Sequence, residues 1–199
     1  MDSTKSVVQL IGHFQELVPL DDGDIATLLP KLEVKKLNKK EYVLQPGQVS
    51  RHMRFIAEGS MRVYYLDEKN QEHTLQLGIE NWWVNDLYSY FSGKPSRMFI
   101  QANEATTLMQ ISKTNLETLY KEVPRLSDFF RMKTQAAYVV LQERTIEHMS
   151  VDAYTRYNAF ISEYRQLEQR FPQYMIASYL GVTPEFLSYL RKKRIPDVS

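Results

Sequence analysis

The chain has 199 residues, of which 43% are hydrophobic and 25% are charged. These proportions are typical of globular domains, so they exclude wholesale disorder and leave enough apolar material for one large core or two small ones. The 25 basic and 24 acidic residues give a formal net charge of +1, so any affinity for a polyanion has to come from local clustering. The absence of cysteine excludes disulfides, thiolate-held zinc, iron–sulfur clusters and cysteine nucleophiles.

The sequence predicts neither a leader peptide nor a membrane span. Its start, residues 1–4, is polar and acidic and is followed by no apolar stretch. The longest apolar run, residues 136–141, is far shorter than the roughly 20 residues that cross a bilayer. We therefore expect a soluble, cytoplasmic protein with no membrane partner.

Two short helices are predicted at the N-terminus. Leu10, Phe14 and Leu17 lie three or four residues apart, as they would on one helical face, and Pro19 ends that helix. Residues 24–32 predict another helical turn or two.

The middle of the chain predicts a series of short strands. They are rich in β-branched and aromatic residues and cover residues 40–44, 55–57, 61–66, 74–77, 99–102 and 107–111. Turn residues 45–48 and the polar hairpin loop 67–70 separate some of them. Short strands at this spacing, without helices between them, favour an antiparallel β-sandwich or roll over a parallel βαβ sheet.

After Ile111 the pattern is helical. Thr114 and Glu117 have the spacing of a capping box, which predicts the start of a helix. Pro124 begins a longer helix that runs to about His148. At 1.5 Å per residue this helix is roughly 37 Å long, which is more than one small β domain can cover.

The long helix carries two apolar stripes and therefore needs two partners. The first stripe consists of Leu126, Phe129, Phe130, Ala137, Val140 and Leu141, and the second of Met132, Ala136, Val139 and Ile146. The helix either lies between two domains of one chain, or has a β domain on one side and a symmetry mate on the other. The second arrangement fits better, so we expect a homodimer.

The C-terminal quarter predicts further helices. Ser150 and Asp152 cap one whose apolar face ends at Phe171 and Pro172, and we place a domain boundary near Ser150.

Residues 173–192 have the pattern of a helix-turn-helix. Ala177 is small enough for two helices to cross closely, and Gly181 suits a turn that needs positive φ. Thr183 is suited to cap the second helix, Pro184 to its first position and Glu185 to the positive end of its dipole.

The second helix of this segment ends in four consecutive basic residues, 191–194. An αα-hairpin with a solvated basic end would explain the pattern without any DNA. The combination of small residue, glycine turn, capped second helix and basic end favours binding of double-stranded DNA. The expected DNA-binding residues are Thr183, Glu185, Ser188, Tyr189, Arg191, Lys192, Lys193 and Arg194.

With these elements the chain resembles the Crp–Fnr transcription regulators over nearly its whole length. The resemblance is sharpest at residues 177–188 and at 81–87, the latter being similar to the family's phosphate-binding turn. It implies an α+β fold: an N-terminal antiparallel, jelly-roll-like β-roll, a long dimerisation helix and a C-terminal helix-turn-helix domain. The implied domains are a cyclic-nucleotide-binding-like effector domain at 1–123, a dimerisation and linker helix at 124–149, and a DNA-binding domain at 150–199.

The resemblance implies a homodimeric, sequence-specific DNA-binding transcription regulator, with a small-molecule effector of unknown identity and RNA polymerase as further candidate partners. The alternative is a regulator-derived dimeric interaction module that no longer binds DNA.

The family's cyclic-nucleotide binders use a glycine, a glutamate and an Arg-Ser pair in the effector pocket. The positions that resemble these here are Asn85, Asp86, Ser96 and Arg97, so the pocket departs from the family's pattern. Asn85 places a side chain where the phosphate would lie, and Arg97 is displaced by one position. We therefore expect no response to cyclic AMP or cyclic GMP.

Trp82 and Trp83 complete the candidate effector pocket, although core and surface aromatics of a small roll would show the same pattern. The four histidines are isolated, so we expect neither a metal site nor a cofactor. No nucleophile-elbow or P-loop pattern occurs, and a cupin-type metal enzyme would need a histidine cluster, so we expect no enzymatic activity.

Overall fold

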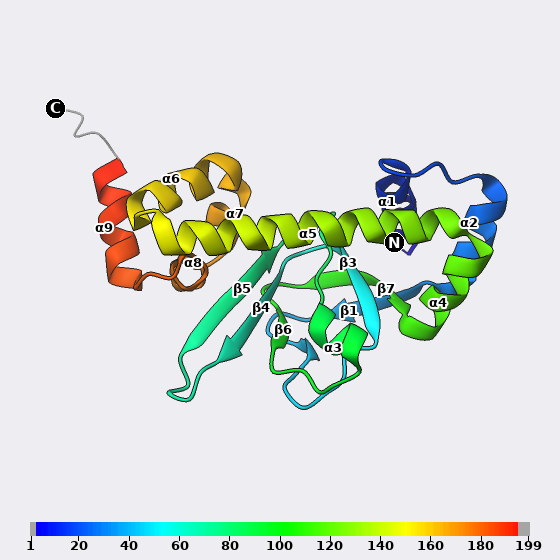
Figure 1. Cartoon of the computed structure of the whole chain (residues 1–199), viewed down its shortest axis with the longest axis horizontal. Helices are drawn as coiled ribbons and strands as arrows, with labels where there is room; N and C mark the ends of the chain where they lie inside the picture. Colours follow the sequence, from blue (N-terminus) through cyan, green and yellow to red (C-terminus); the bar gives the residue numbers. More distant parts are fainter. Residues whose placement is uncertain (1–2, 195–199) are drawn as a thin grey trace.

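The computed structural model describes residues 3–194. Figure 1 shows a long helix, α5 (Pro124–Ser150), that runs along the molecule and joins an N-terminal part to a cluster of C-terminal helices. The other helices are α1 (Ser3–Gln15), α2 (Asp22–Leu28), the 3-10 turn η1 (Leu29–Lys31), α3 (Leu87–Ser92), α4 (Lys113–Glu122), α6 (Ala153–Glu163), α7 (Arg165–Arg170), α8 (Gln173–Leu180) and α9 (Pro184–Arg194). The strands are β1 (Glu33–Leu37), β2 (Tyr42–Leu44), β3 (His52–Glu58), β4 (Met61–Leu66), β5 (Glu72–Gly78), β6 (Phe99–Ala102) and β7 (Thr106–Ser112).

The strands form two antiparallel sheets, with the orders β1-β7-β3 and β2-β6-β4-β5. Their facing sides enclose an apolar core around Ile56, Val63 and Ile100. β5 lies at the edge of its sheet, which matters below because an edge strand leaves backbone groups unpaired. The predicted α+β fold, with its antiparallel roll, long helix and C-terminal helical part, is confirmed.

Two elements were missing from the sequence prediction. β1 has four exposed residues out of five, so it lacks the apolar alternation that signals a strand. α3 is only six residues long and is capped by Asp86, whose carboxylate accepts a hydrogen bond from the Ser89 N–H.

The predicted N-terminal helix ends earlier than its apolar spacing suggested. Leu10 and Phe14 are fully buried on α1, but Leu17 lies beyond the last helical residue and is exposed. The Val18 N–H still donates to the Phe14 carbonyl, and the regular helix has ended at Gln15, before Pro19.

Two of the predicted helix boundaries were wrong. α4 is capped by Ser112, whose hydroxyl accepts from the Asn115 N–H, so Thr114 lies inside the first turn instead of capping it. The helix expected between Asp152 and Phe171 is broken at Tyr164, which has φ −122° and ψ 43° and separates α6 from α7. Asp152 does cap α6, whereas Ser150 is the last residue of α5.

The apolar stripes of α5 are buried only along its first turns. Leu126, Phe129 and Phe130 are buried in a core formed with α1, α4 and the roll. Met132, predicted on the second, unpartnered stripe, packs against the same core, so this part of the second stripe has a partner within the chain. From Ala136 onward both stripes are exposed.

Among residues 3–194, no helix is both long and apolar enough to cross a membrane.

Candidate nucleic-acid interface and ligand cavity

α8 and α9 form the helix-turn-helix that the sequence predicted. Gly181 has φ +69° and follows α8, where the Val182 N–H closes the turn onto the Ala177 carbonyl at 3.0 Å. Ala177 is fully buried between the helices, and Leu187 and Leu190 of α9 are buried in the same core. The turn geometry therefore follows from the residue types, as expected for a left-handed helix end.

The first turns of α9 present an exposed polar and aromatic face. Thr183 caps the helix by accepting from the Phe186 N–H at 3.2 Å. Glu185, Ser188 and Tyr189 are exposed, and the Tyr189 ring stacks on the exposed Phe186 ring at 5.9 Å. None of these side chains contributes to the core, so this face is free to meet a partner.

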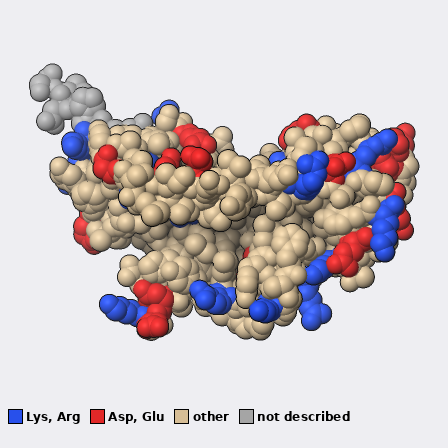
Figure 2. All heavy atoms as spheres, in the orientation of Figure 1, with Lys and Arg blue, Asp and Glu red and all other residues tan. Residues whose placement is uncertain are grey.

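The basic residues at the end of α9 lie at one end of the molecule, which Figure 2 shows with Lys and Arg atoms in blue. The Arg191 Nε lies 3.6 Å from Glu168 Oε1, and the Lys193 ammonium lies 4.7 Å from the centre of the Tyr154 ring. Lys192 is exposed. The side chain of Arg194, also predicted to bind DNA, lies outside the described part of the structure.

The helix-turn-helix is docked on the β-roll through α8. The Ser178 hydroxyl accepts from the Thr74 N–H at 2.9 Å and donates to the Glu72 carbonyl at 2.8 Å. It thereby satisfies backbone groups at the open edge of β5. Leu77 and Ile79 of the roll are buried in the core of the C-terminal domain, so the contact is apolar as well as polar.

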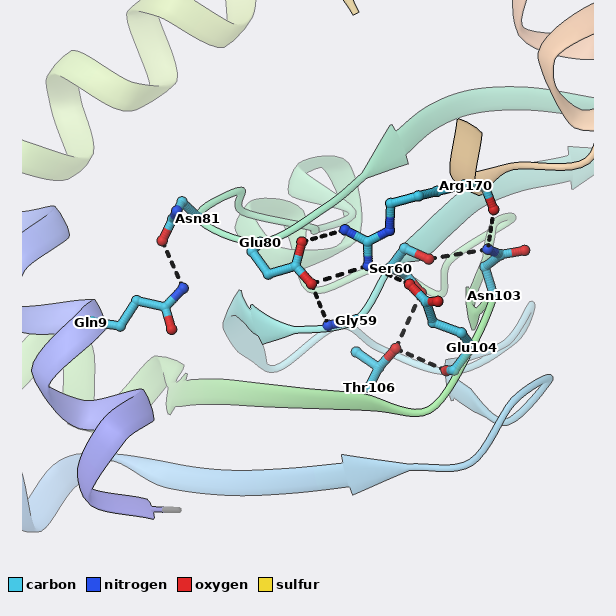
Figure 3. A network of polar contacts seen from close by, with 9 residues as sticks. All are labelled: Gln9, Gly59, Ser60, Glu80, Asn81, Asn103, Glu104, Thr106 and Arg170. Atoms are coloured by element: carbon cyan, nitrogen blue, oxygen red, sulfur yellow. Dashed lines mark hydrogen bonds and ion pairs between the residues drawn. The ribbon is translucent and has the colours of Figure 1, made fainter. Parts of the chain in front are cut away.

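A second contact joins α7 to the roll, and Figure 3 shows its polar network. The Arg170 guanidinium donates to both carboxylate oxygens of Glu80 and also to Glu104. The Arg170 carbonyl accepts from the Asn103 amide at 3.1 Å, and the Glu80 carboxylate accepts from the Gly59 N–H at 2.8 Å. These two carboxylates raise the pKa of Arg170 further above its ordinary value. Burial raises the pKa of Glu80, but the hydrogen bonds from Arg170 and from backbone N–H groups outweigh it, so the net shift is downward.

Arg144 ties the long helix into the same interface. Its guanidinium donates to the carbonyls of Thr74, Leu75 and Tyr179, with a distance of 2.8 Å to Tyr179, and lies 3.9 Å from the centre of the Tyr179 ring. Burial lowers the pKa of Arg144. One side chain thus connects α5, β5 and α8.

A cavity of about 430 Å³ lies where the roll, α5 and the C-terminal domain meet. The roll contributes Trp82, Trp83 and Asn85 of the predicted effector pocket. No aspartate or glutamate is among its lining residues, whereas Lys133 and Arg144 of α5 are. The cavity is therefore mostly apolar and aromatic with a positive bias.

The other residues of the predicted effector pocket lie elsewhere. Asp86 and Ser96 are both buried, and the Ser96 hydroxyl donates to the Asp86 carboxylate at 2.6 Å. Arg97 is exposed. Asn85 is not among the described residues with positive φ, and its side-chain oxygen accepts from the Arg54 N–H at 2.9 Å. Asn85, Asp86 and Ser96, three of the four positions that would hold a phosphate, are thus engaged with the protein itself.

Sequence reasoning missed Arg54, a guanidinium buried inside the roll. It is 3% exposed, makes no ion pair with a described residue, and donates to the Ser50 hydroxyl at 3.3 Å and the His52 carbonyl at 3.2 Å. Burial lowers its pKa to about 10, so the group stays charged at neutral pH. Nothing in the strand pattern signals it, because an arginine between apolar residues normally points to solvent.

No group of three or more metal-ligating side chains is brought together within the described residues.

Sequence reasoning also missed the residues that dock the C-terminal domain, Arg144, Arg170 and Ser178. Their partners are largely backbone carbonyls and distant glutamates, which no local spacing reveals.

Comparison with known proteins places this geometry in context. Residues 34–123 match the family model of the cyclic nucleotide-binding domain. No curated protein sequence matches the chain significantly. The fold is similar to that of the c-di-GMP responsive global regulator CLP of Xanthomonas campestris, with TM-score 0.71, 14% identity, and 87% of this chain and 91% of that chain covered.

Two further solved structures have the same fold. FixK2 of Bradyrhizobium japonicum has TM-score 0.72 and 15% identity, with 81% of this chain and 83% of that chain covered. A transcriptional regulator of the crp/fnr family from Eubacterium rectale has TM-score 0.67 and 15% identity, with 87% and 83% covered. The resemblance predicted from the sequence is confirmed by these matches.

Proposed function

We propose that this chain, which carries a cyclic nucleotide-binding domain within the fold of the Crp/Fnr family transcription regulators, is a sequence-specific DNA-binding transcription regulator. It acts as a cytoplasmic homodimer and is not an enzyme. The observation that carries the proposal is the face of α9. Its polar and aromatic residues and its basic end are exposed, while the opposite side of the helix-turn-helix is used for docking.

The exposed face suits the major groove. Glu185, Ser188 and Tyr189 can reach base edges, and the basic residues at the end of the helix can hold phosphates. The ion pair of Arg191 with Glu168 is long at 3.6 Å, so a phosphate can compete for this guanidinium.

The apolar surface of α5 supports the homodimer. Large side chains remain exposed on its second half: Tyr138, Val139, Val140, Leu141, Ile146 and Met149. Figure 2 shows an uncharged surface over the middle of this helix. A patch of this kind on a protein surface is typical of an interface, and a two-fold axis along the helix would bury it against its own copy.

The cavity supports the proposal of a small-molecule effector, and RNA polymerase is a candidate partner of the DNA-bound dimer. Three residues of the predicted effector pocket line this cavity, whereas the buried pair Asp86 and Ser96 does not. We therefore assign the effector to the cavity and leave the pair a structural role.

A gel-shift with fragments of the source genome at low salt tests DNA binding. We expect discrete shifted bands for some fragments, and weaker binding by the double variant Lys192→Gln/Lys193→Gln. The matched control is Lys35→Gln/Lys36→Gln, which removes the same charge from exposed positions on β1. Absence of any fragment-specific shift would favour the alternative, a dimeric interaction module that no longer binds DNA.

A further inference from the structure

We propose that Phe186 and Tyr189 form an apolar platform on α9 that contacts the 5-methyl groups of thymines in the major groove. Thymine methyl groups would then decide which operator, the DNA sequence bound most tightly, this chain prefers. The inference rests on the proposed function, because it names the feature of DNA that the exposed face of α9 recognises.

The two rings form an exposed aromatic surface that the fold does not use. Phe186 is 43% exposed and Tyr189 56%, and their rings stack with 5.9 Å between centroids and 22° between planes. Within the described residues, the apolar core of the C-terminal domain includes Leu187 and Leu190 of α9 and neither of these rings. An aromatic pair that stays exposed favours an interaction surface, because aromatic side chains are enriched where a partner covers them.

The charges along α9 place this pair over base edges and not over phosphates. Glu185 lies in the first turn, next to Phe186, and is exposed, so its carboxylate repels the negatively charged backbone of DNA. The basic residues begin at Arg191, towards the other end of the helix. At 1.5 Å per residue, this arginine lies about 9 Å further along the helix axis than Glu185. The acidic and aromatic start of α9 therefore suits the floor of the groove, and its basic end suits the backbone.

The residue types on this face select thymine among the four bases. Thymine alone presents a methyl group in the major groove, and apolar side chains contact it there. Guanine is read by arginine or lysine, and adenine by asparagine or glutamine. The exposed residues from Thr183 to Tyr189 include none of those four types. An apolar contact with thymine is thus the base readout that this pair of rings can provide.

The spacing of the two rings suits neighbouring base pairs. Residues three apart lie on the same face of a helix, and the centroids of these rings are 5.9 Å apart. Successive base pairs are about 3.4 Å apart along the DNA axis, so the platform spans between one and two base steps. Two thymines of one half-site can therefore be contacted together, one by each ring.

Replacement of thymine by deoxyuridine tests the contact, because uracil keeps the base pair and the O4 acceptor and lacks only the methyl group. The operator is first selected from a random duplex library with the wild-type protein. It is then synthesised with deoxyuridine at each thymine position in turn, in both half-sites, and at all of them together. Burial of one methyl group corresponds to about fourfold in affinity, so the fully substituted operator should bind roughly tenfold more weakly or worse.

Four variants assign the effect to the aromatic pair. Phe186→Ala should remove the effect of uracil at one thymine position of the half-site, and Tyr189→Ala should remove it at another. Tyr189→Phe keeps both rings and should retain the wild-type response at every position. Tyr88→Ala, the matched control, removes an exposed tyrosine from α3 on the roll and should also retain it. Circular dichroism checks that each variant is folded.

Equal affinity of the wild type for the thymine and uracil operators would overturn the inference and leave the proposed function standing. An unchanged effect of uracil in both alanine variants of α9 would do the same, because other residues would then read the methyl groups. If the selection yields no preferred sequence, the proposed function itself fails, and the inference fails with it.

Discussion

Arg170 and Glu80 form a two-pronged ion pair that joins the C-terminal domain to the β-roll, although 90 positions separate them in the sequence. Glu104 accepts from the same guanidinium. The pair is only partly buried, with 29% and 33% of the two side chains exposed, so its strength comes from geometry more than from exclusion of water.

Arg170→Gln should weaken docking by about 1–3 kcal/mol, because it removes the charge while keeping part of the hydrogen bonding. Urea unfolding followed by tryptophan emission should show a lower midpoint. Arg165→Gln, an exposed position at the start of α7, is the control and should leave the midpoint in place. The pKa of Glu80 is lowered in the folded protein, so the stabilisation is present above the ordinary glutamate pKa and is lost as the pH falls through the folded value. The two midpoints should therefore converge in acid.

Gly59→Ala should destabilise the roll by more than the usual penalty for positive φ. Gly59 has φ +91°, and an added Cβ would lie 2.5 Å from the Ala105 carbonyl oxygen. Gly47 has φ +87° with open space around it, so Gly47→Ala isolates the cost of the backbone conformation, about 1 kcal/mol. Thermal unfolding of both variants gives the comparison. An equal loss of stability in the two variants would show that the roll relaxes around the new methyl group.

Val139→Asp should convert the proposed dimer to a monomer. Val139 is 56% exposed on α5 of the single chain, so the substitution harms the fold little, but it would bury an unpaired charge at a helix–helix seam. Analytical ultracentrifugation measures the change. Gln142→Asp, at an exposed polar position on the same helix, is the comparison for charge alone. A wild-type protein that sediments as a monomer would contradict the proposed dimer.

Tyr189→Ala and Lys193→Ala should affect DNA binding in different ways. Tyr189 is exposed in the middle of α9, where it can contact bases, so its loss should relax sequence preference. Lys193 should contact phosphate, so its removal should weaken binding to all sequences alike and reduce the salt slope by about 0.9 for each phosphate that it neutralises. Binding to specific and random DNA is measured at several salt concentrations. Footprinting should show an inverted repeat with half-sites about 34 Å apart. Identical effects of the two substitutions on specific and random DNA would contradict the assignment of Tyr189 to bases and Lys193 to phosphate.

Cyclic AMP and cyclic GMP should not bind with micromolar affinity, although residues 34–123 match the cyclic nucleotide-binding domain. Ser96 donates to Asp86 instead of offering a guanidinium to a phosphate. The absence of such a charge-assisted hydrogen bond costs about 1.5–3 kcal/mol. Calorimetric titration with each nucleotide measures the affinity. A micromolar dissociation constant would show that the buried pair opens to receive the ligand.

The parts of the fold that sequence predicts are those with local causes. Gly181, Thr183 and Pro184 define the turn and start of α9 by their own backbone preferences, and the structure has the turn where they place it. The strands were predictable where apolar residues alternate, and β1 was missed because it carries mostly exposed polar residues.

The docked arrangement had no local signal. The sequence around Ser178 predicts a helix whether or not the residue contacts β5. Arg170 has the position of an ordinary basic residue at the end of a helix. The sequence predicted the two tryptophans of the candidate pocket but not the wall that the C-terminal helices contribute. Tyr164 and Tyr179 reach the cavity only because the C-terminal domain folds back on the roll.

The Ser178 hydroxyl has a consequence for the lifetime of any undocked state. It occupies backbone groups of β5 that would otherwise be open at the sheet edge, beside the exposed Leu75. A strand edge of this kind is a template on which a second chain can add its own strand. Release of the C-terminal domain therefore exposes the protein to self-association through β5, and docking acts as a built-in protection against aggregation.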